Sequence, residues 1–134
     1  MTTGELYKLA EKTDTEIIVG HLKHNKGFSV LDDDGDAHIV IRHKYETTAE
    51  ERVVLAHELG HCMRGAFYNL YSPYEARGKQ ERQADTWAIE RLVPKDEFFA
   101  ACKGGAHYPY EIAEVFNITS QFAEKVMRYY LCRD

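Results

Sequence analysis

The spacing of hydrophobic residues changes several times along the chain, and each change marks a predicted element. Leu6, Leu9 and Ala10 recur at the spacing of one helix face, which predicts a short amphipathic helix over residues 5–11. Three short runs rich in β-branched residues follow, and each is bounded by turn-forming residues, which is typical of strands. The predicted strands are Glu16–Val19, Phe28–Leu31 and His38–Arg42, and the last two form a hairpin.

Helical spacing dominates the chain from residue 48 onward. Thr48-Ala49-Glu50-Glu51 has the composition of a capping box and predicts the start of a long helix, for which Gly65 is the predicted stop. We predict a connecting loop over residues 67–78 and a second helix over residues 78–93, which Pro94 ends. Packing is the favoured use of the tyrosines in the predicted loop, and lining a cleft is the alternative: Tyr68, Tyr71 and Tyr74.

The last part of the chain predicts short helices over residues 96–102, 109–116 and 119–131, with Thr119 as the cap of the last one. The last two helices, joined by a tight turn, resemble a helix-turn-helix. Few side chains of the second helix could read bases, so packing or docking of a partner is favoured over DNA binding. We expect one domain over residues 1–134, with a C-terminal helical section from about 105 to 134.

Composition and charge narrow the class of protein. The chain has 134 residues, 44% of them hydrophobic and 29% charged, which is typical of a globular domain. Its net charge of −5 opposes binding to phosphate backbones, so nucleic acid is not an expected partner. Neither a membrane span nor a signal peptide is visible, and the three cysteines are widely spaced, so we expect a cytoplasmic protein with reduced thiols.

An acidic run lies between the second and third predicted strands. Asp32, Asp33, Asp34 and Asp36 surround Gly35, a composition that predicts a turn. The run could be taken for a calcium loop, but the glutamate that closes an EF-hand is missing. A turn is therefore the favoured interpretation.

The most informative motif is His57-Glu58-Leu59-Gly60-His61, an H-E-x-x-H sequence within the first long helix. Residues four apart on a helix have Cβ atoms about 5–6 Å apart, so His57 and His61 can bind one zinc ion. Glu58 is rotated away from that line and faces the water that the metal activates. The motif predicts a zinc site with its own general base.

A catalytic zinc ion usually has three protein ligands, and the second long helix supplies a candidate for the third. Glu81 and Asp85 continue the face formed by its apolar residues, where a carboxylate is costly to bury unless it is paired. We predict that Glu81 is the third ligand and that Asp85 accepts the second ring N–H of His57. The alternative is that both are solvated acids on a charged helix.

The chain resembles the ImmA/IrrE metallopeptidases in three motifs. These are A-H-E-L-G-H at residues 56–61, E-x-x-A-D-x-W-A at residues 81–88 and L-V-P at residues 92–94. The resemblance implies an α+β, zincin-like domain: a three-stranded sheet, the HExxH helix, a second ligand-bearing helix and a short C-terminal helical tail. It also implies His57, His61 and Glu81 as zinc ligands and Glu58 as the base.

The resemblance extends to a biological role. Members of this family look like cytoplasmic proteases, often of mobile elements or prophages, that cleave or inactivate a helix-turn-helix repressor and so release transcription. Two positions depart from the pattern, because Gly65 stands where many relatives have a histidine and Trp87 where they have a phenylalanine. Neither change affects a predicted ligand.

Several alternatives stay open at this stage. The chain could be a zinc-binding module that sequesters a repressor without cutting it, or a zincin peptidase with broad substrates. Manganese, cobalt or iron could replace zinc at a nitrogen and oxygen site. The strand His38–Arg42 is a candidate sheet edge for binding an extended substrate, and the candidates for stabilising the oxyanion are Tyr45, His107 and the loop tyrosines.

Overall fold

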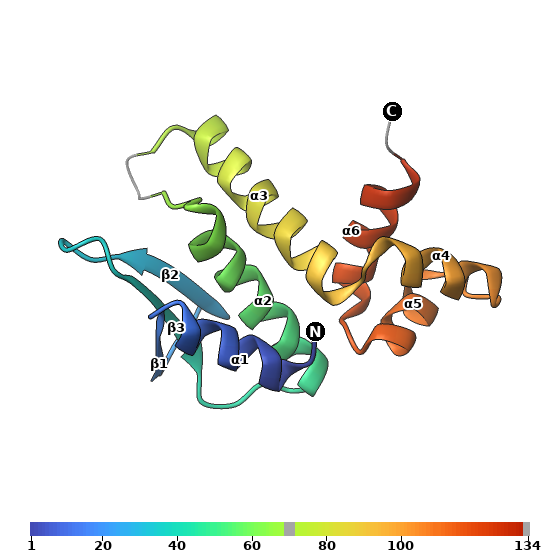
Figure 1. Cartoon of the computed structure of the whole chain (residues 1–134), viewed down its shortest axis with the longest axis horizontal. Helices are drawn as coiled ribbons and strands as arrows, with labels where there is room; N and C mark the ends of the chain where they lie inside the picture. Colours follow the sequence, from blue (N-terminus) through green and yellow to red (C-terminus); the bar gives the residue numbers. More distant parts are fainter. Residues whose placement is uncertain (69–71, 133–134) are drawn as a thin grey trace.

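The computed structural model of the chain describes residues 1–68 and 72–132, and within them it has an α+β arrangement, as predicted. Figure 1 shows the sheet and α1 at one end of the molecule, α4 to α6 at the other, and α2 and α3 between them. In chain order the elements are α1 (Thr3–Lys12), β1 (Glu16–Gly20), β2 (Gly27–Leu31), β3 (Ala37–Arg42), α2 (Thr48–Arg64), α3 (Tyr74–Leu92), α4 (Lys95–Lys103), α5 (Pro109–Phe116) and α6 (Ser120–Leu131).

The three strands form a mixed sheet in the order β1-β3-β2. β3 lies in the centre, because it pairs in parallel with β1 and antiparallel with β2. The prediction that this strand, His38–Arg42, offers a free sheet edge is therefore wrong. Its two isoleucines, Ile39 and Ile41, are buried beneath α2, as expected for a strand with a neighbour on each side. Within residues 1–68 and 72–132, β2 is the strand beside the candidate site that has a neighbouring strand on one side only.

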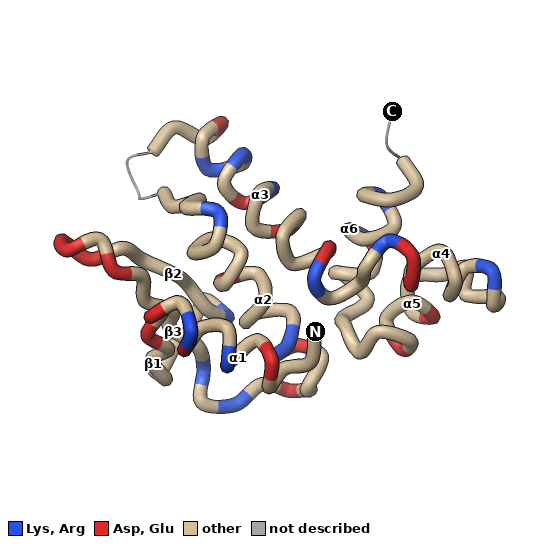
Figure 2. The backbone as a smooth tube through the Cα atoms, viewed as in Figure 1, with Lys and Arg blue, Asp and Glu red and all other residues tan. Residues whose placement is uncertain are grey.

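The acidic run forms the turn between β2 and β3, and Figure 2 shows its acidic residues at one tip of the molecule. The Asp32 carboxylate accepts hydrogen bonds from the backbone N–H groups of Asp34 and Asp36, both at 2.9 Å. The turn interpretation thus matches the observed geometry, since an aspartate that bonds to N–H groups two and four residues on is a turn-forming device.

The start of α2 differs by one residue from the predicted capping box. Thr47, not Thr48, is the N-cap, and its hydroxyl accepts a hydrogen bond from the Glu50 N–H at 3.1 Å. Two threonines in succession both fit the sequence rule, and only the backbone conformation distinguishes them. The helix ends as predicted at Gly65, whose φ of 61° is a left-handed conformation that favours glycine.

Helix α3 begins at Tyr74, inside the segment predicted as a loop. The prediction was wrong because Gly78 was taken for a boundary, whereas in the structure it lies within the helix. A glycine in a helix costs only about 1 kcal/mol relative to alanine, and packing along the rest of a long helix can offset that cost. Of the predicted loop tyrosines, Tyr71 lies outside the described residues, and Tyr74 is 90% exposed at the start of α3.

The close approach of α2 and α3 sets the geometry of the site. A Cβ atom added to Gly60 would lie 2.5 Å from the carbonyl oxygen of Ala84, so only a glycine permits the two helices to cross here. Gly60 adjoins His61, and Ala84 lies three residues after Glu81 on the facing helix. The crossing thereby places the predicted third ligand against the two histidines.

The C-terminal section packs against the end of α3. The Tyr130 hydroxyl of α6 donates a hydrogen bond to the Val93 carbonyl at 2.6 Å, and its ring contacts Phe98 of α4 with a centroid distance of 5.0 Å. Thr119 caps α6, as predicted, by accepting from the Phe122 N–H. Across the described residues, no helix combines the length and apolar character needed to cross a membrane.

Candidate metal centre

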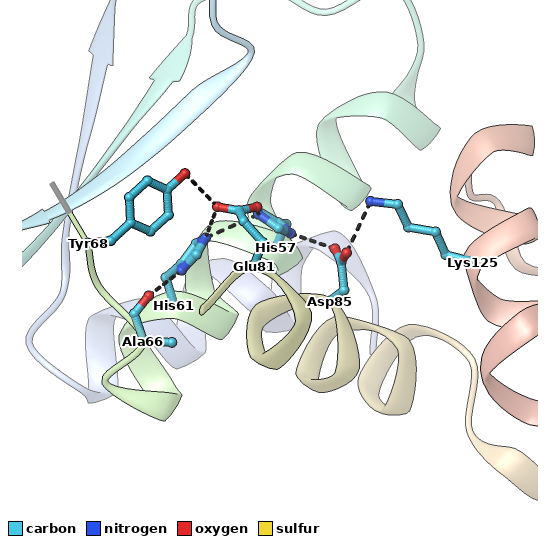
Figure 3. A network of polar contacts seen from close by, with 7 residues as sticks. All are labelled: His57, His61, Ala66, Tyr68, Glu81, Asp85 and Lys125. Carbon is cyan, nitrogen blue, oxygen red and sulfur yellow. Dashed lines mark hydrogen bonds and ion pairs between the residues drawn. The ribbon is translucent and has the colours of Figure 1, made fainter. Parts of the chain in front are cut away.

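The three predicted ligands converge on one point between α2 and α3, as Figure 3 shows. The Nε2 atoms of His57 and His61 lie 3.2 Å apart. The Glu81 carboxylate closes the triangle, with one oxygen 2.8 Å from His57 Nε2 and the other 3.0 Å from His61 Nε2. Three side chains from two helices therefore face each other through two nitrogen and two oxygen atoms.

The outer ring nitrogens of both histidines are held by acceptors. His57 Nδ1 lies 2.8 Å from an Asp85 carboxylate oxygen, the contact that the sequence predicted. His61 Nδ1 donates to the Ala66 carbonyl at 2.5 Å, and a carbonyl oxygen can only accept. Both contacts favour the tautomer whose hydrogen is on Nδ1, and they leave the two Nε2 lone pairs facing inward.

This donor set fits a divalent cation. The inward atoms of His57, His61 and Glu81 all carry lone pairs, so they require a positive charge among them, either a proton or a metal ion. The pKa shifts of His57 and Glu81 also indicate that a positive charge is favoured among these residues. Burial lowers the pKa of His57, but hydrogen bonds to Asp85 and Glu81 outweigh it and raise the pKa well above its usual range. Burial raises the pKa of Glu81, but its bonds to the two histidines reverse that effect and lower the pKa.

Two imidazoles and one carboxylate are ligands typical of zinc in hydrolases. The carboxylate is two-fifths exposed and the cleft reaches the site, so a fourth position for water or substrate is accessible. The same donors also suit manganese, cobalt or iron. The chemistry of the residues thus agrees with a catalytic metal ion and favours zinc.

Glu58 lies beside the three converging residues and is not one of them. Its side chain is 7% exposed and lines the cavities on both sides of the site. Burial raises the pKa of the Glu58 carboxyl, against the lowering effects of His57, His61 and a hydrogen bond with Ser29 of β2. A largely buried carboxyl that lines the cleft has the position that a general base requires.

Tyr68 belongs to the site, although its sequence position left two uses open. Its hydroxyl donates a hydrogen bond to the Glu81 carboxylate at 2.9 Å, and its ring lies 6.1 Å from that of His61. Tyr45 is instead bound to the Lys26 carbonyl, and among the described residues neither it nor His107 lines the two cavities at the site. Of the residues considered for stabilising the oxyanion, the structure brings Tyr68 to the cleft.

Lys125 was not predicted to approach the site at all. Its ammonium group, on α6, lies 3.1 Å from the Asp85 carboxylate oxygen that His57 does not use. Figure 3 shows this contact reaching across from α6 to α3. The residues are 40 positions apart, and no local pattern in the sequence marks them as neighbours.

The fold is that of a small α+β, zincin-like domain, and three of its side chains are placed where they could hold a metal ion. The chain belongs to the IrrE N-terminal-like domain family, peptidase family M78, whose model matches residues 10–127. Membership of this family places the chain among metallopeptidases of the ImmA/IrrE type, as the motifs indicated. Among curated proteins, none matches the chain significantly.

A solved structure with the same fold is a Mycobacterium tuberculosis transcriptional regulator. The TM-score is 0.68 and the sequences are 14% identical, so this similarity concerns the fold alone. The match covers 92% of this chain and 40% of that one. The chain therefore spans well under half the length of that regulator.

Proposed function

We propose that the protein is a zinc-dependent endopeptidase that hydrolyses a peptide bond in a helix-turn-helix transcriptional repressor. The observation that carries this proposal is the convergence of His57, His61 and Glu81 beside a buried Glu58 at an open cleft. A zinc ion that served only to stabilise the fold would be enclosed by four ligands and would have no use for a base. The geometry therefore favours catalysis over sequestration.

Each residue of the site has a distinct role in the proposed reaction. His57, His61 and Glu81 would hold the zinc ion, and Asp85 would keep His57 in the tautomer that presents Nε2 to it. Zinc supplies a Lewis acid that polarises the scissile carbonyl and lowers the pKa of water. Glu58 takes the proton of the attacking water and passes it to the nitrogen of the leaving amine. The Tyr68 hydroxyl is the candidate donor to the oxyanion.

The substrate backbone would lie along β2. This strand pairs with β3 on one side only, and Gly27, Phe28 and Ser29 line the cleft with Glu58. An extended peptide can add to such an edge through main-chain hydrogen bonds, which makes cleavage depend on local unfolding or extension of the substrate. The edge used is thus β2 rather than the central strand β3.

The repressor substrate is proposed from the family and from charge. The structural neighbour is a transcriptional regulator, and the ImmA/IrrE resemblance implies a helix-turn-helix repressor as partner. A net charge of −5 disfavours direct binding to DNA, so an effect on transcription would pass through a protein. We infer an antirepressor of the cytoplasm, of the kind carried by mobile elements or prophages.

The test incubates the purified protein with zinc and a candidate helix-turn-helix repressor, chosen from the genes next to its own where one encodes such a protein. Glu58→Gln should retain zinc and lose cleavage by about 10²–10⁴-fold, because only proton transfer is removed. Glu81→Ala should lose both zinc and cleavage. Glu90→Gln, an exposed change of the same kind on α3, should behave as the unaltered protein.

The outcomes separate the alternatives. Full relief of repression in cells by Glu58→Gln would contradict proteolysis and establish sequestration of the repressor. Cleavage of casein-like substrates without any of the repressor would instead establish a peptidase with broad substrates. Mass spectrometry of the repressor after co-expression identifies the scissile bond.

A further inference from the structure

A groove leads away from the candidate metal centre between α2 and α6. A cavity of about 220 Å³ starts at His57 and Glu58, and a second of about 160 Å³ continues it toward the start of α6. The two cavities share five lining residues, which makes them one groove: Lys26, Val53, Val54, Phe122 and Lys125.

The position of the groove follows from the helical repeat of α2. Val53 and Val54 precede His57 and Glu58 by four residues each, so they lie one turn away on the same face. Gly27 of β2 packs closely on this turn, since a Cβ atom there would lie 2.8 Å from Val54 Cγ1. The groove therefore begins where the edge of β2, along which the substrate would lie, meets the proposed base.

Apolar side chains form the larger part of the groove, and its polar lining comes from Asp85 beside the site and from Glu50, Thr119 and Gln121 at the far end. Val53, Val54 and the buried ring of Phe122 form the apolar part, and the aliphatic stems of the two lysines extend the apolar surface at the mouth. The far side of the site differs, because the larger cavity of about 480 Å³ is lined there by Ser29, Tyr68 and the Glu81 carboxylate. The groove side of Glu58 is thus more apolar than the other side, where Phe28, Val30 and Phe67 accompany the polar residues.

The two lysines at the mouth of the groove do not favour the binding of an acidic substrate side chain. Lys26 is paired with Glu50 at 3.0 Å, and Lys125 is paired with Asp85 at 3.1 Å. Each ammonium charge is therefore balanced by a carboxylate of the protein. A substrate carboxylate in the groove would have to displace one of these pairs and leave a protein carboxylate without its partner.

We propose that the groove is a specificity pocket that binds a large apolar side chain, such as leucine, methionine or phenylalanine, adjoining the scissile bond. The proposal rests on the peptidase function and adds to it the chemistry of the bond that is chosen. Because Phe122 and Lys125 belong to α6, the C-terminal helical section supplies one wall of this pocket. Selection then depends on a part of the chain that contributes no proposed ligand.

The first experiment exposes the zinc-loaded protein to a peptide mixture from a digested proteome and identifies the cleaved bonds by mass spectrometry. We expect leucine, methionine and phenylalanine to be favoured about 10-fold or more over alanine, on one side of the bond only. Val53→Phe should fill the groove and shift the preference to small residues, whereas Val53→Ala should admit larger ones. Val115→Phe, the same change on the exposed face of α5, is the control.

Cleavage without an apolar preference, or a preference for aspartate and glutamate, would overturn the proposal, as would an unchanged profile in both Val53 variants. Thermal unfolding of each variant is measured alongside, so that a loss of fold is recognised. The two Val53 changes act in opposite directions on pocket size, which a general loss of stability cannot imitate.

The second experiment does not depend on catalysis. Zinc-loaded Glu58→Gln protein with labelled valine methyl groups is titrated with N-acetyl-leucine amide and, separately, with N-acetyl-glutamate amide. We expect saturable shifts of the Val53 and Val54 signals with the leucine probe only, and their loss in Val53→Phe. If these shifts occur but no peptide is cut, the pocket stands and the peptidase function fails; if they are missing, the pocket is refuted.

Discussion

Asp85 does not belong to the three converging residues, but it binds the outer ring nitrogen of the proposed ligand His57. Its carboxylate holds His57 Nδ1 at 2.8 Å and is itself one-fifth exposed. We expect Asp85→Asn to lower zinc affinity about 10- to 100-fold, because a neutral amide no longer favours the tautomer and basicity of His57.

Competition with a coloured zinc chelator measures this affinity. Glu90→Gln, which also removes one negative charge from α3 but lies on its exposed face, is the matched control. Equal affinities for the two variants would show that Asp85 has no part in zinc binding.

His38 gives the sheet a dependence on pH that is separate from the metal centre. Its ring nitrogens lie 2.7 Å from Asp32 and 2.9 Å from Glu16, and these hydrogen bonds raise the pKa of His38 above the usual histidine value of about 6.5. A raised pKa in the folded state means that the protonated ring stabilises folding. That contribution is complete below about pH 6.5 and is lost as the pH rises through the folded-state pKa.

Urea unfolding of the metal-free protein at several pH values measures this effect. The difference in stability between the protein and His38→Gln should be largest under acidic conditions and should shrink as the pH rises. His24→Gln, a change at an exposed histidine outside the strands, is the control. A difference that stays constant with pH would refute the assignment.

Helices α2 and α3 approach each other so closely at Gly60 that no side chain fits there. The missing Cβ of Gly60 would lie 2.5 Å from the Ala84 carbonyl, a distance that requires the backbones to separate. We expect Gly60→Ala to destabilise the protein by roughly 1–3 kcal/mol, the usual cost of an extra methyl group in a packed interface. Zinc affinity should fall as well, because Glu81 moves with α3.

Gly4→Ala in α1 provides the comparison, since only the Thr2 hydroxyl lies near its Cβ, at 3.9 Å. There alanine should be neutral or stabilising by about 0.5–1 kcal/mol, as is usual in a helix. Urea denaturation gives both values. A Gly60→Ala protein as stable as the original would mean that the two helices are not held by this contact.

The boundaries of the elements show where local rules reach their limit. The strands and most helices were predicted within a few residues, because periodicity and breakers act over short distances. The N-cap shifted from Thr48 to Thr47, and α3 extended through Gly78 to Tyr74. Both differences arise because several conformations satisfied the local pattern and packing of the whole helix selected one.

Zinc should stabilise the whole molecule, because its ligands come from two helices that only the folded chain brings together. An ion that binds the folded state alone adds about 2.7 kcal/mol of stability at a free concentration 100 times its dissociation constant. We expect thermal unfolding to shift upward with zinc and back with a chelator. Glu81→Ala should show a much smaller shift, and an equal one would contradict the proposed ligand set.

The kinds of element and the residue types of the candidate metal centre could be predicted from the sequence. His57 and His61 are one helical turn apart in any helix, and Glu81 was found as a carboxylate on an apolar face. The order of the strands could not be predicted from local patterns. In the described structure, this order makes β2 the edge strand beside the cleft. The tertiary structure also brought Tyr68 and Lys125 to the site, from a connecting segment and from α6. The physical reason is the sequence separation of the contacts involved. Hydrophobic periodicity reflects contacts between residues a few positions apart, whereas strand order and helix crossing depend on contacts between distant parts of the chain.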